Sequence, residues 1–307
     1  MVRRMSGRAP GFLGFQQMRE PGRTGLRAAP GRTAGICRTR RSDLEEWLMS
    51  ARTASRTRRL AAFGAGAAAL ALLTTGCAGD ASADGGAEPE HKSFALSGRT
   101  LTVDSDDSRI ELVTGDGDEV RVTRWFTGRA LLGSTPRADW TVEGDELKLR
   151  VSCSGIVTTC DAEHRIEVPA DVAVSLRTQD GGVTAKGFTT PLTLRGSDAS
   201  LTVEDVSGPL DLHSADGAIT ARSVSSSRVR ARTEDGSLTL ALARAPQRID
   251  ASSEDGSVTV ELPEAAYDVR TKVQDGRTNV SVLEDRASSR VVSVTTQDGN
   301  VTVRPAG

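Results

Sequence analysis

Residues 229–262 read VRARTEDGSLTLALARAPQRIDASSEDGSVTVEL, and this stretch contains one short pattern twice. An aspartate followed by glycine stands near the middle of each copy, at Asp235 and at Asp255. Apolar residues alternate with polar ones beside this pair, as in the Leu-Thr-Leu run at 238–240. Because successive side chains of a strand point to opposite faces, the alternation predicts strands with one buried face.

The same unit occurs seven times between residues 172 and 303, at intervals of 18 to 23 residues. The units align on an acidic turn residue, which is Asp180, Asp198, Asp216, Asp235, Asp255, Asp275 or Asp298. Glycine follows six of the seven, and Ala199 follows Asp198. Each unit therefore predicts a strand, an Asp-Gly turn, a second strand and a looser corner.

Three positions of the unit are apolar columns. The position six before each aspartate is a branched aliphatic residue in all seven units, and the position five after it is always apolar. The position three after it is apolar in six units, and Thr278 is the exception. Between the last two columns stands threonine in six units and Asn279 in the seventh. The apolar columns are the expected core, with Val260 as one of its members.

Two architectures fit this pattern. An Asp-Gly pair between alternating strands is a strong hairpin signal, which would give an antiparallel sandwich or meander. In a parallel β-solenoid each unit is one coil, and equivalent residues stack about 4.8 Å apart. Hairpins need not repeat one residue type in one column seven times, whereas stacked coils do. We therefore predict an all-β chain whose residues 171–307 form a parallel β-solenoid, with the antiparallel sandwich or meander as the alternative.

Residues 93–170 show a different all-β pattern, and we expect them to form a cap on the solenoid. The strands expected there are 100–103, 109–113, 120–126, 140–142 and 146–152. Two of the three tryptophans, Trp125 and Trp140, lie in this region, so it is bulkier than the repeats.

Residues 49–77, MSARTASRTRRLAAFGAGAAALALLTTGC, have the layout of an export signal. Four arginines precede an uncharged stretch from residue 60 to residue 75, and small residues follow it. Its 16 residues are marginal for crossing roughly 30 Å of hydrocarbon, which disfavours the alternative of a transmembrane anchor.

The last five residues of that stretch, LTTGC at 73–77, resemble the lipobox of bacterial lipoproteins. In that family the cysteine thiol is acylated and the signal is cut before it. The resemblance implies that residues 49–76 are a lipoprotein signal peptide and that Cys77 is lipidated. It also implies a membrane anchor on the extracytoplasmic face of the cell, to which each buried CH₂ of acyl chain contributes about 0.8 kcal/mol.

The segments on either side of this signal have their own expectations. Residues 77–92 are small and acidic, and we expect a flexible tether there. Residues 1–48 are rich in arginine, glycine and proline without a hydrophobic period. We interpret them as a non-native N-terminal extension, with translation starting at Met49, or as a disordered segment.

Cys153 and Cys160 flank six residues within the expected cap. A hairpin of that length brings the sulfurs together, and thiols oxidise in exported proteins. A metal pair there lacks companion ligands, because only His164 is near in sequence. We predict a disulfide, which in the chain-entropy model contributes about 2–3 kcal/mol of stability.

The folded part as a whole is similar to the β-strand-repeat putative-adhesin family of bacterial envelope proteins, whose function is not settled. The resemblance is carried by the turns Gly117-Asp118-Glu119 and Gly144-Asp145-Glu146, the Cys153…Cys160 pair, the Ile166–Pro169 strand end and the repeated Asp-Gly units. These features are architectural, so they imply a fold and a cell-surface location rather than an activity.

Charge and composition exclude several functions. The net charge of the chain is −2, but residues after 76 carry 25 basic and 37 acidic side chains. This acidic body disfavours nucleic acid as a partner. Aromatic residues make up 3% of the chain, which leaves little for sugar-stacking subsites.

No catalytic residues and no cofactor are predicted. His213 and Asp211 should point outward from one strand, where nothing orients them, and the known nucleotide-binding, nucleophile-elbow and zinc-protease motifs do not occur. The seven turn aspartates should stack into a ladder, each bonding backbone N–H groups of its own turn. Weak calcium binding by this ladder is the alternative, since hard cations take carboxylate oxygens.

The sequence thus favours a non-enzymatic, lipid-anchored surface protein, an adhesin or a scaffold that binds an unknown surface or cell-wall partner. A polysaccharide-active enzyme on the same scaffold is one alternative. A structural element that polymerises through its coil ends is the other.

Overall fold

The computed structural model describes residues 87–307. The expected signal peptide, Cys77 and most of the expected tether lie outside the described residues. Within the described part, no helix is long and apolar enough to cross a membrane.

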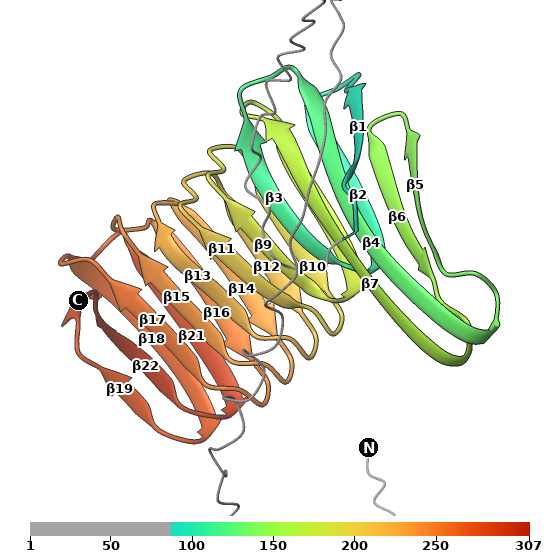
Figure 1. The fold of residues 1–307 in the computed structure, drawn as a ribbon. Helices are drawn as coiled ribbons and strands as arrows, with labels where there is room; N and C mark the ends of the chain where they lie inside the picture. The colour runs from blue at the N-terminus through green and yellow to red at the C-terminus, as the bar shows by residue number, and fades with distance from the viewer. Residues whose placement is uncertain (1–86) are drawn as a thin grey trace, which may run out of the picture. The chain divides into compact units, whose positions relative to one another are not determined.

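The described domain is built from two sheets of 11 strands each, which face one another across a single core (Figure 1). Sheet A contains, in spatial order, β1 (Glu90–Ala95), β4 (Glu119–Gly133), β7 (Gly155–Pro169), β3 (Arg109–Gly115), β9 (Gly182–Lys186), β11 (Ser200–Glu204), β13 (Ile219–Val224), β15 (Leu238–Leu242), β17 (Val258–Leu262), β22 (Val301–Pro305) and β19 (Thr278–Val280). Sheet B contains β20 (Leu283–Glu284), β18 (Ala266–Asp275), β21 (Val291–Asp298), β16 (Arg248–Ser253), β14 (Arg228–Thr233), β12 (Leu210–Ser214), β10 (Leu192–Gly196), β8 (Ala173–Asp180), β2 (Thr100–Asp107), β6 (Glu146–Ser152) and β5 (Arg137–Glu143).

The repeats pair in parallel, so the predicted solenoid is confirmed and the antiparallel meander is excluded for them. Each repeat places its first strand in sheet B and its second in sheet A. Equivalent residues are direct partners in the ladder, as in Leu192 with Leu210 and Thr202 with Thr220. Antiparallel pairing among the described strands occurs only in the region before the repeats, between β1 and β4, β4 and β7, and β5 and β6.

The aliphatic columns fill the space between the sheets. Val260 is fully buried, as are Leu240, Val303 and most of their counterparts in the other coils. The threonine column lies on the outer face of sheet A, where its members are half-buried. The large buried side chains Phe188 and Tyr267 belong to the core.

The turn glycines are required by the stacking of coils. A Cβ at Gly217 would overlap the carbonyl oxygen of Ala199, and a Cβ at Gly236 would overlap that of Gly217. At these positions the backbone does not adopt a left-handed conformation. The Asp-Gly pair therefore marks a close approach between neighbouring coils, and it does not form the hairpin turn that the dipeptide usually signals.

The turns are bonded by a column of inward hydroxyl groups that stands two residues before the aspartate. Ser214 Oγ donates to the carbonyl of Ala199 at 2.8 Å and accepts from the N–H of Gly217 at 3.1 Å. Thr233 and Ser253 donate in the same way to carbonyls of the preceding coil. The expected bonds from each ladder aspartate to its own turn are not among the hydrogen bonds of residues 87–307. The hydroxyl column takes that role, because its oxygen points into the stack.

At the C-terminal end the coils do not stack in chain order. Strands β21 and β22, the last in the sequence, pair with β16 and β17 on one side. On their other side they pair with β18 and β19, which precede them in the chain. The coil of Asp275 is therefore outermost, and the coil of Asp298 lies between it and the coil of Asp255.

The N-terminal end shows the mirror-image arrangement. Strands β2 and β3 form a coil whose Asp107 is paired with Asp180, so the aspartate ladder has an eighth member. This coil lies between β6–β7, which follow it in the chain, and β8–β9, which come later still. The strands of residues 93–170 thus share both sheets and the core with the repeats, and β1 begins three residues before the expected start at Ser93.

Candidate functional site on the outer face of sheet B

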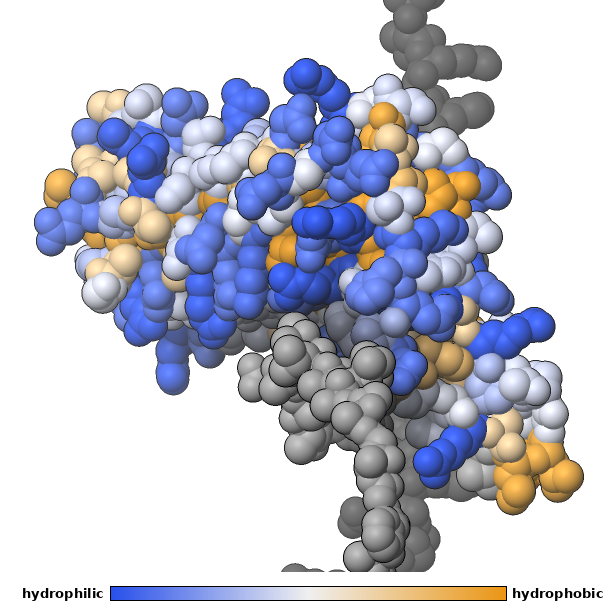
Figure 2. Space-filling model, turned by 45° about the horizontal axis from the view of Figure 1, so that its top comes forward, coloured by the Kyte–Doolittle hydropathy of each residue, from blue (hydrophilic) through white to orange (hydrophobic). Residues whose placement is uncertain are grey.

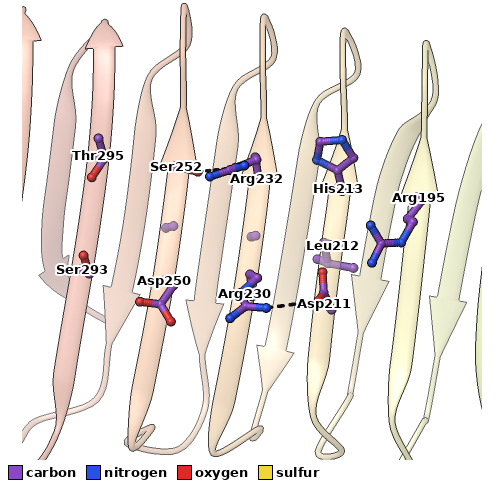
Figure 3. Close-up of a pocket in the computed structure, with 12 residues that line it drawn as sticks. Arg195, Asp211, Leu212, His213, Arg230, Arg232, Asp250, Ser252, Ser293 and Thr295 are labelled. Atoms are coloured by element: carbon purple, nitrogen blue, oxygen red, sulfur yellow. Dashed lines mark hydrogen bonds and ion pairs between the residues drawn. The ribbon is translucent and has the colours of Figure 1, made fainter.

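A row of basic side chains crosses the outer face of sheet B. Arg177, Arg195, His213 and Arg232 are consecutive partners in the parallel ladder from β8 to β14, and we call them the basic row. Alternation places them outside, because their neighbours along each strand fill the core. Successive members are one coil apart, about 4.8 Å. Figure 3 shows the last three at one level of adjacent strands.

The three arginines of the basic row have no carboxylate partner. None of them forms a salt bridge with any described residue, and Arg232 instead donates to Ser252 Oγ at 3.3 Å. Asp104, the next residue in the row beyond Arg177, is held by Arg150 at 3.1 Å. These guanidinium groups are exposed and keep their donors available for an anion.

A hollow of about 630 Å³ lies against the basic row, and Arg195, His213 and Arg232 are among the residues that line it. It forms where the long side chains of the row are followed by short ones on the next strands. Ser252, Ser293 and Thr295 line one side of it, and Arg230 and Arg232 lie on the neighbouring strand, with Arg232 pointing toward Ser252 (Figure 3). Past the short residues, the ladder places Arg270 beside Ser293 and Lys272 beside Thr295.

Acidic residues of this face are neutralised by neighbours. Asp211 lies 3.8 Å from Arg230, and Asp250 accepts from Arg248 at 2.7 Å. The face therefore has a positive surplus, although residues 87–307 carry 25 basic and 35 acidic side chains. His213 and Asp211 both point outward, as predicted, and they occupy different rows of the face.

The aspartate ladder runs along the turn edge beside this face. Neighbouring coils bring Asp198, Asp216 and Asp235 close enough to interact. A hydrogen bond that protonated Asp216 donates to Asp198 raises the pKa of Asp216, and the charges of Asp198 and Asp235 raise it further. Among the described residues, no group of three or more carboxylate, imidazole or thiol side chains is placed to hold a metal ion. Calcium binding by the ladder stays a prediction.

The predicted pair Cys153–Cys160 forms a disulfide with a Cα–Cα distance of 6.3 Å. Cys160 lies in the outer half of the two-stranded ribbon made by β4 and β7, opposite Gly128 and five residues from the end of the ribbon at Gly155. Four of the predicted cap strands are present with longer bounds, as β2, β3, β4 and β5, and the fifth matches β6.

His164 is the one fully buried histidine of the described domain, and its two ring nitrogens have no hydrogen-bond partner. It packs 6.4 Å from the ring of Trp140, which also carries the guanidinium of Arg124 at 4.4 Å. Burial lowers the pKa of His164 to about 4, and the charge of Arg124 adds to this. The imidazole is therefore neutral near neutral pH and serves as part of the core.

Comparison with known protein families matches residues 80–304 to the family described as Toastrack DUF4097. The chain belongs to the Toastrack DUF4097 family. The match covers the whole described domain except the last three residues, so cap and repeats are one family domain. None of the curated proteins is significantly similar to this Toastrack chain.

Three solved structures are among those that match this chain. A putative adhesin from Parabacteroides distasonis ATCC 8503 is 9% identical, over 70% of this chain and 97% of that one, with a TM-score of 0.44. One from Parabacteroides merdae ATCC 43184 is 10% identical, over 70% and 95%, with a TM-score of 0.38. One from Bacteroides fragilis NCTC 9343 is 12% identical, over 71% and 97%, with a TM-score of 0.35.

Sequence reasoning missed the basic row, although the repeats contain its signal. The position three before each turn aspartate is basic in five of seven units, in the order Arg177, Arg195, His213, Arg232, Ser252, Lys272, Thr295. The basic column was visible once the units were aligned.

Proposed function

We propose that this Toastrack protein is a non-enzymatic, lipid-anchored adhesin or envelope-binding scaffold of the outer cell surface. Its ligand is an extended polymer with regularly repeated anionic groups, bound along the basic row. The single observation that carries this proposal is the row itself, in which four successive coils carry three arginines without a carboxylate partner and one histidine at about one-coil spacing.

The geometry of the row supports a linear ligand. A polymer lying across the strands, parallel to the stacking direction, meets a basic side chain on every coil from β8 to β14. The hollow beside Arg230 and Arg232 accepts its bulkier groups. Arginine suits phosphate and carboxylate alike, because its planar fork donates two parallel hydrogen bonds.

Other features support binding over catalysis. Phe188 and Tyr267, the only aromatic residues after Trp140, are fully buried, so they offer no stacking subsite for a sugar ring. The carboxylates on the face are already paired with arginines, which leaves no free acid–base couple.

The short edge strands at the C-terminal end disfavour polymerisation through that end. At the C-terminal end the outermost strands, β19 and β20, are three and two residues long. Very short edge strands offer few unpaired backbone groups for addition of another chain.

Binding can be measured with two anionic probes, poly(glycerol phosphate) and polygalacturonate, against neutral dextran. The substitution set Arg177→Gln, Arg195→Gln and Arg232→Gln should weaken binding of the anionic probe at least tenfold, and added salt should weaken the native interaction. The matched set Arg222→Gln, Arg244→Gln and Arg286→Gln removes the same charge from exposed sites elsewhere. Equal losses in both sets would reduce the row to general electrostatics, and the preferred probe identifies phosphate or carboxylate as the anion.

The anchor has its own test. Cys77→Ala should remove the acylation site. The variant should carry no lipid and should be lost from the membrane fraction. Unchanged membrane retention with an unmodified Cys77 in the native protein would contradict lipidation.

A further inference from the structure

The ribbon formed by β4 and β7 extends beyond the layered body of the domain. Residues 127–133 of β4 pair with residues 155–161 of β7. The other neighbours of these strands stop earlier, since β1 reaches only to Arg124 and β3 only to Glu163. The outer half of the ribbon is therefore a two-stranded projection, visible on the right of Figure 1.

The ribbon tip is apolar where a solvated hairpin is normally polar. The exposed fractions of Leu131, Leu132 and Ile156 are 64%, 72% and 76%. In Figure 2 apolar side chains are grouped at the end of the domain that carries this ribbon. Arg129 and Arg137 are exposed next to this group. Apolar side chains rimmed by arginine fit the interface of an anionic lipid bilayer.

The path of the chain places this tip near the expected anchor. Strand β1 is antiparallel to β4, with Glu90 opposite Arg124 and Ala95 opposite Glu119. The chain before Glu90 therefore enters from the tip side of the domain. Leu132 lies eight residues beyond Arg124 along β4, or about 27 Å.

The tether length is compatible with simultaneous contact. Thirteen residue steps separate Cys77 from Glu90, a span of at most about 45 Å when fully extended. A flexible chain of that length has a mean end-to-end distance of about 20 Å. A bilayer that holds Cys77 is therefore within reach of the ribbon tip.

We propose that the β4–β7 ribbon tip inserts Leu131, Leu132 and Ile156 into the outer leaflet to which Cys77 is anchored. This inference rests on the lipid anchorage proposed above. The tip then acts as a second contact, which fixes the orientation of the domain and turns the outer face of sheet B in a defined direction relative to the membrane. The disulfide Cys153–Cys160 ties the outer half of β7 to the segment that follows β6.

The experiment uses the full-length protein, expressed with its own signal sequence and mixed with vesicles of brominated phosphatidylcholine and phosphatidylglycerol, with tryptophan emission as readout. Leu132→Trp should show blue-shifted emission that bromolipid quenches, beyond the constant background of the native tryptophans. Leu283→Trp is the matched control, because Leu283 is 69% exposed in β20, an edge strand at the C-terminal end of the stack, whereas the ribbon lies at the N-terminal end. Its emission should be neither shifted nor quenched.

The outcomes separate the two proposals. Protein that does not associate with vesicles, with Cys77 unmodified, overturns the anchor and with it the tip contact. Protein that is anchored but shows no quenching in Leu132→Trp overturns the tip contact alone. A blue shift without quenching, together with sedimentation as a dimer, means that the tip binds a second copy, and it also overturns the lipid proposal.

Discussion

The central coils and the two ends of the stack differ in how the order of strands along the chain relates to their order in space. From β8 to β17, each coil stacks on the coil that precedes it in the chain. At both ends the chain instead skips one layer on its way outward and then returns to fill the position that it skipped. Column regularity is therefore enough to build the centre, whereas each end needs a coil adapted to having one neighbour.

The outermost C-terminal coil carries that adaptation in its sequence. Thr278 stands where the other six units have an apolar residue, and both Thr278 and Asn279 are exposed. The coil of Asp298, which is last in the chain, has the regular Val301-Thr302-Val303 and lies inside. This unit lies outermost with only one side covered, and polar residues are therefore tolerated at positions that are apolar in the inner coils.

The largest effect should come from a charge in a central column. Val260→Asp buries a carboxylate without a partner, and we expect a loss of about 4 kcal/mol or more in the free energy of unfolding. Thr259→Asp, one residue away on the outer face, should change it by no more than about 0.5 kcal/mol. Chemical denaturation measures both, and similar losses in the two variants would contradict the assignment of faces.

The next largest effect on stability should come from His164 in the cap, and it depends on pH. Folding lowers the pKa of His164 from 6.5 to about 4, so between these values the unfolded chain binds more protons. Stability should therefore fall by about 3 kcal/mol as the pH is lowered through this window. In His164→Leu this component disappears. A difference curve between native and variant proteins that is flat from pH 6.5 to pH 4 would refute it.

A turn glycine separates close stacking from an open turn. Gly236→Ala places a Cβ against the carbonyl of Gly217, and we expect a cost of about 2–3 kcal/mol. Gly117→Ala, in the turn between β3 and β4, meets only the backbone nitrogen of Glu119 at 4.0 Å. It should be nearly neutral in the same thermal unfolding measurement. A neutral Gly236→Ala would show that the coils can separate at little cost.

The reversed order of the last two coils predicts that substitutions in one column have different costs in an inner coil and in the outermost coil. Val258→Thr puts a hydroxyl group into the buried core and should cost about 1.5 kcal/mol. Thr278→Val, at the same column in the outer coil, should cost almost nothing, since the position is exposed. Equal costs in denaturant titrations would argue that the coil of Asp275 is covered.

The smallest effect concerns the aspartate ladder. Neighbouring aspartates raise the pKa of Asp216, so its ionised form is disfavoured in the folded protein. This contribution lowers stability as the pH rises through the titration of the carboxyl group. Asp216→Asn should therefore raise the melting temperature slightly at neutral pH and leave it unchanged in strong acid. A lower melting temperature at neutral pH would mean that this carboxylate stabilises its turn.

Much of the centre could be predicted from sequence, because each side chain there packs on its own copy. The columns through Val260 and Leu240 identified the core, and their repetition favoured coils over hairpins. The Asp-Gly pair alone pointed to the wrong turn, since glycine is used there for contact between coils. The hydroxyl column of Ser214 and Thr233 was overlooked, because small polar residues also occur in ordinary turns.

The ends and the surface could not be predicted in the same way. The order of coils depends on contacts between strands distant in the chain, and only the exception at Thr278 hinted at it. The basic row depends on which acidic neighbours pair elsewhere, as Asp104 does with Arg150. The apolar tip around Leu132 depends on where the supporting strands end.

The doubling back of the chain at both ends limits how such a molecule can grow. A duplicated unit appended after residue 307 would start beside the buried coil of Asp298 and find both flanking positions already occupied. A unit added within the stretch from β8 to β17 meets no such obstacle, because neighbours there follow one another in the gene as they do in space. Internal duplication of a unit from β8 to β15, each of which carries a basic residue at this position, would extend the basic row by one side chain per copy while both ends stay closed.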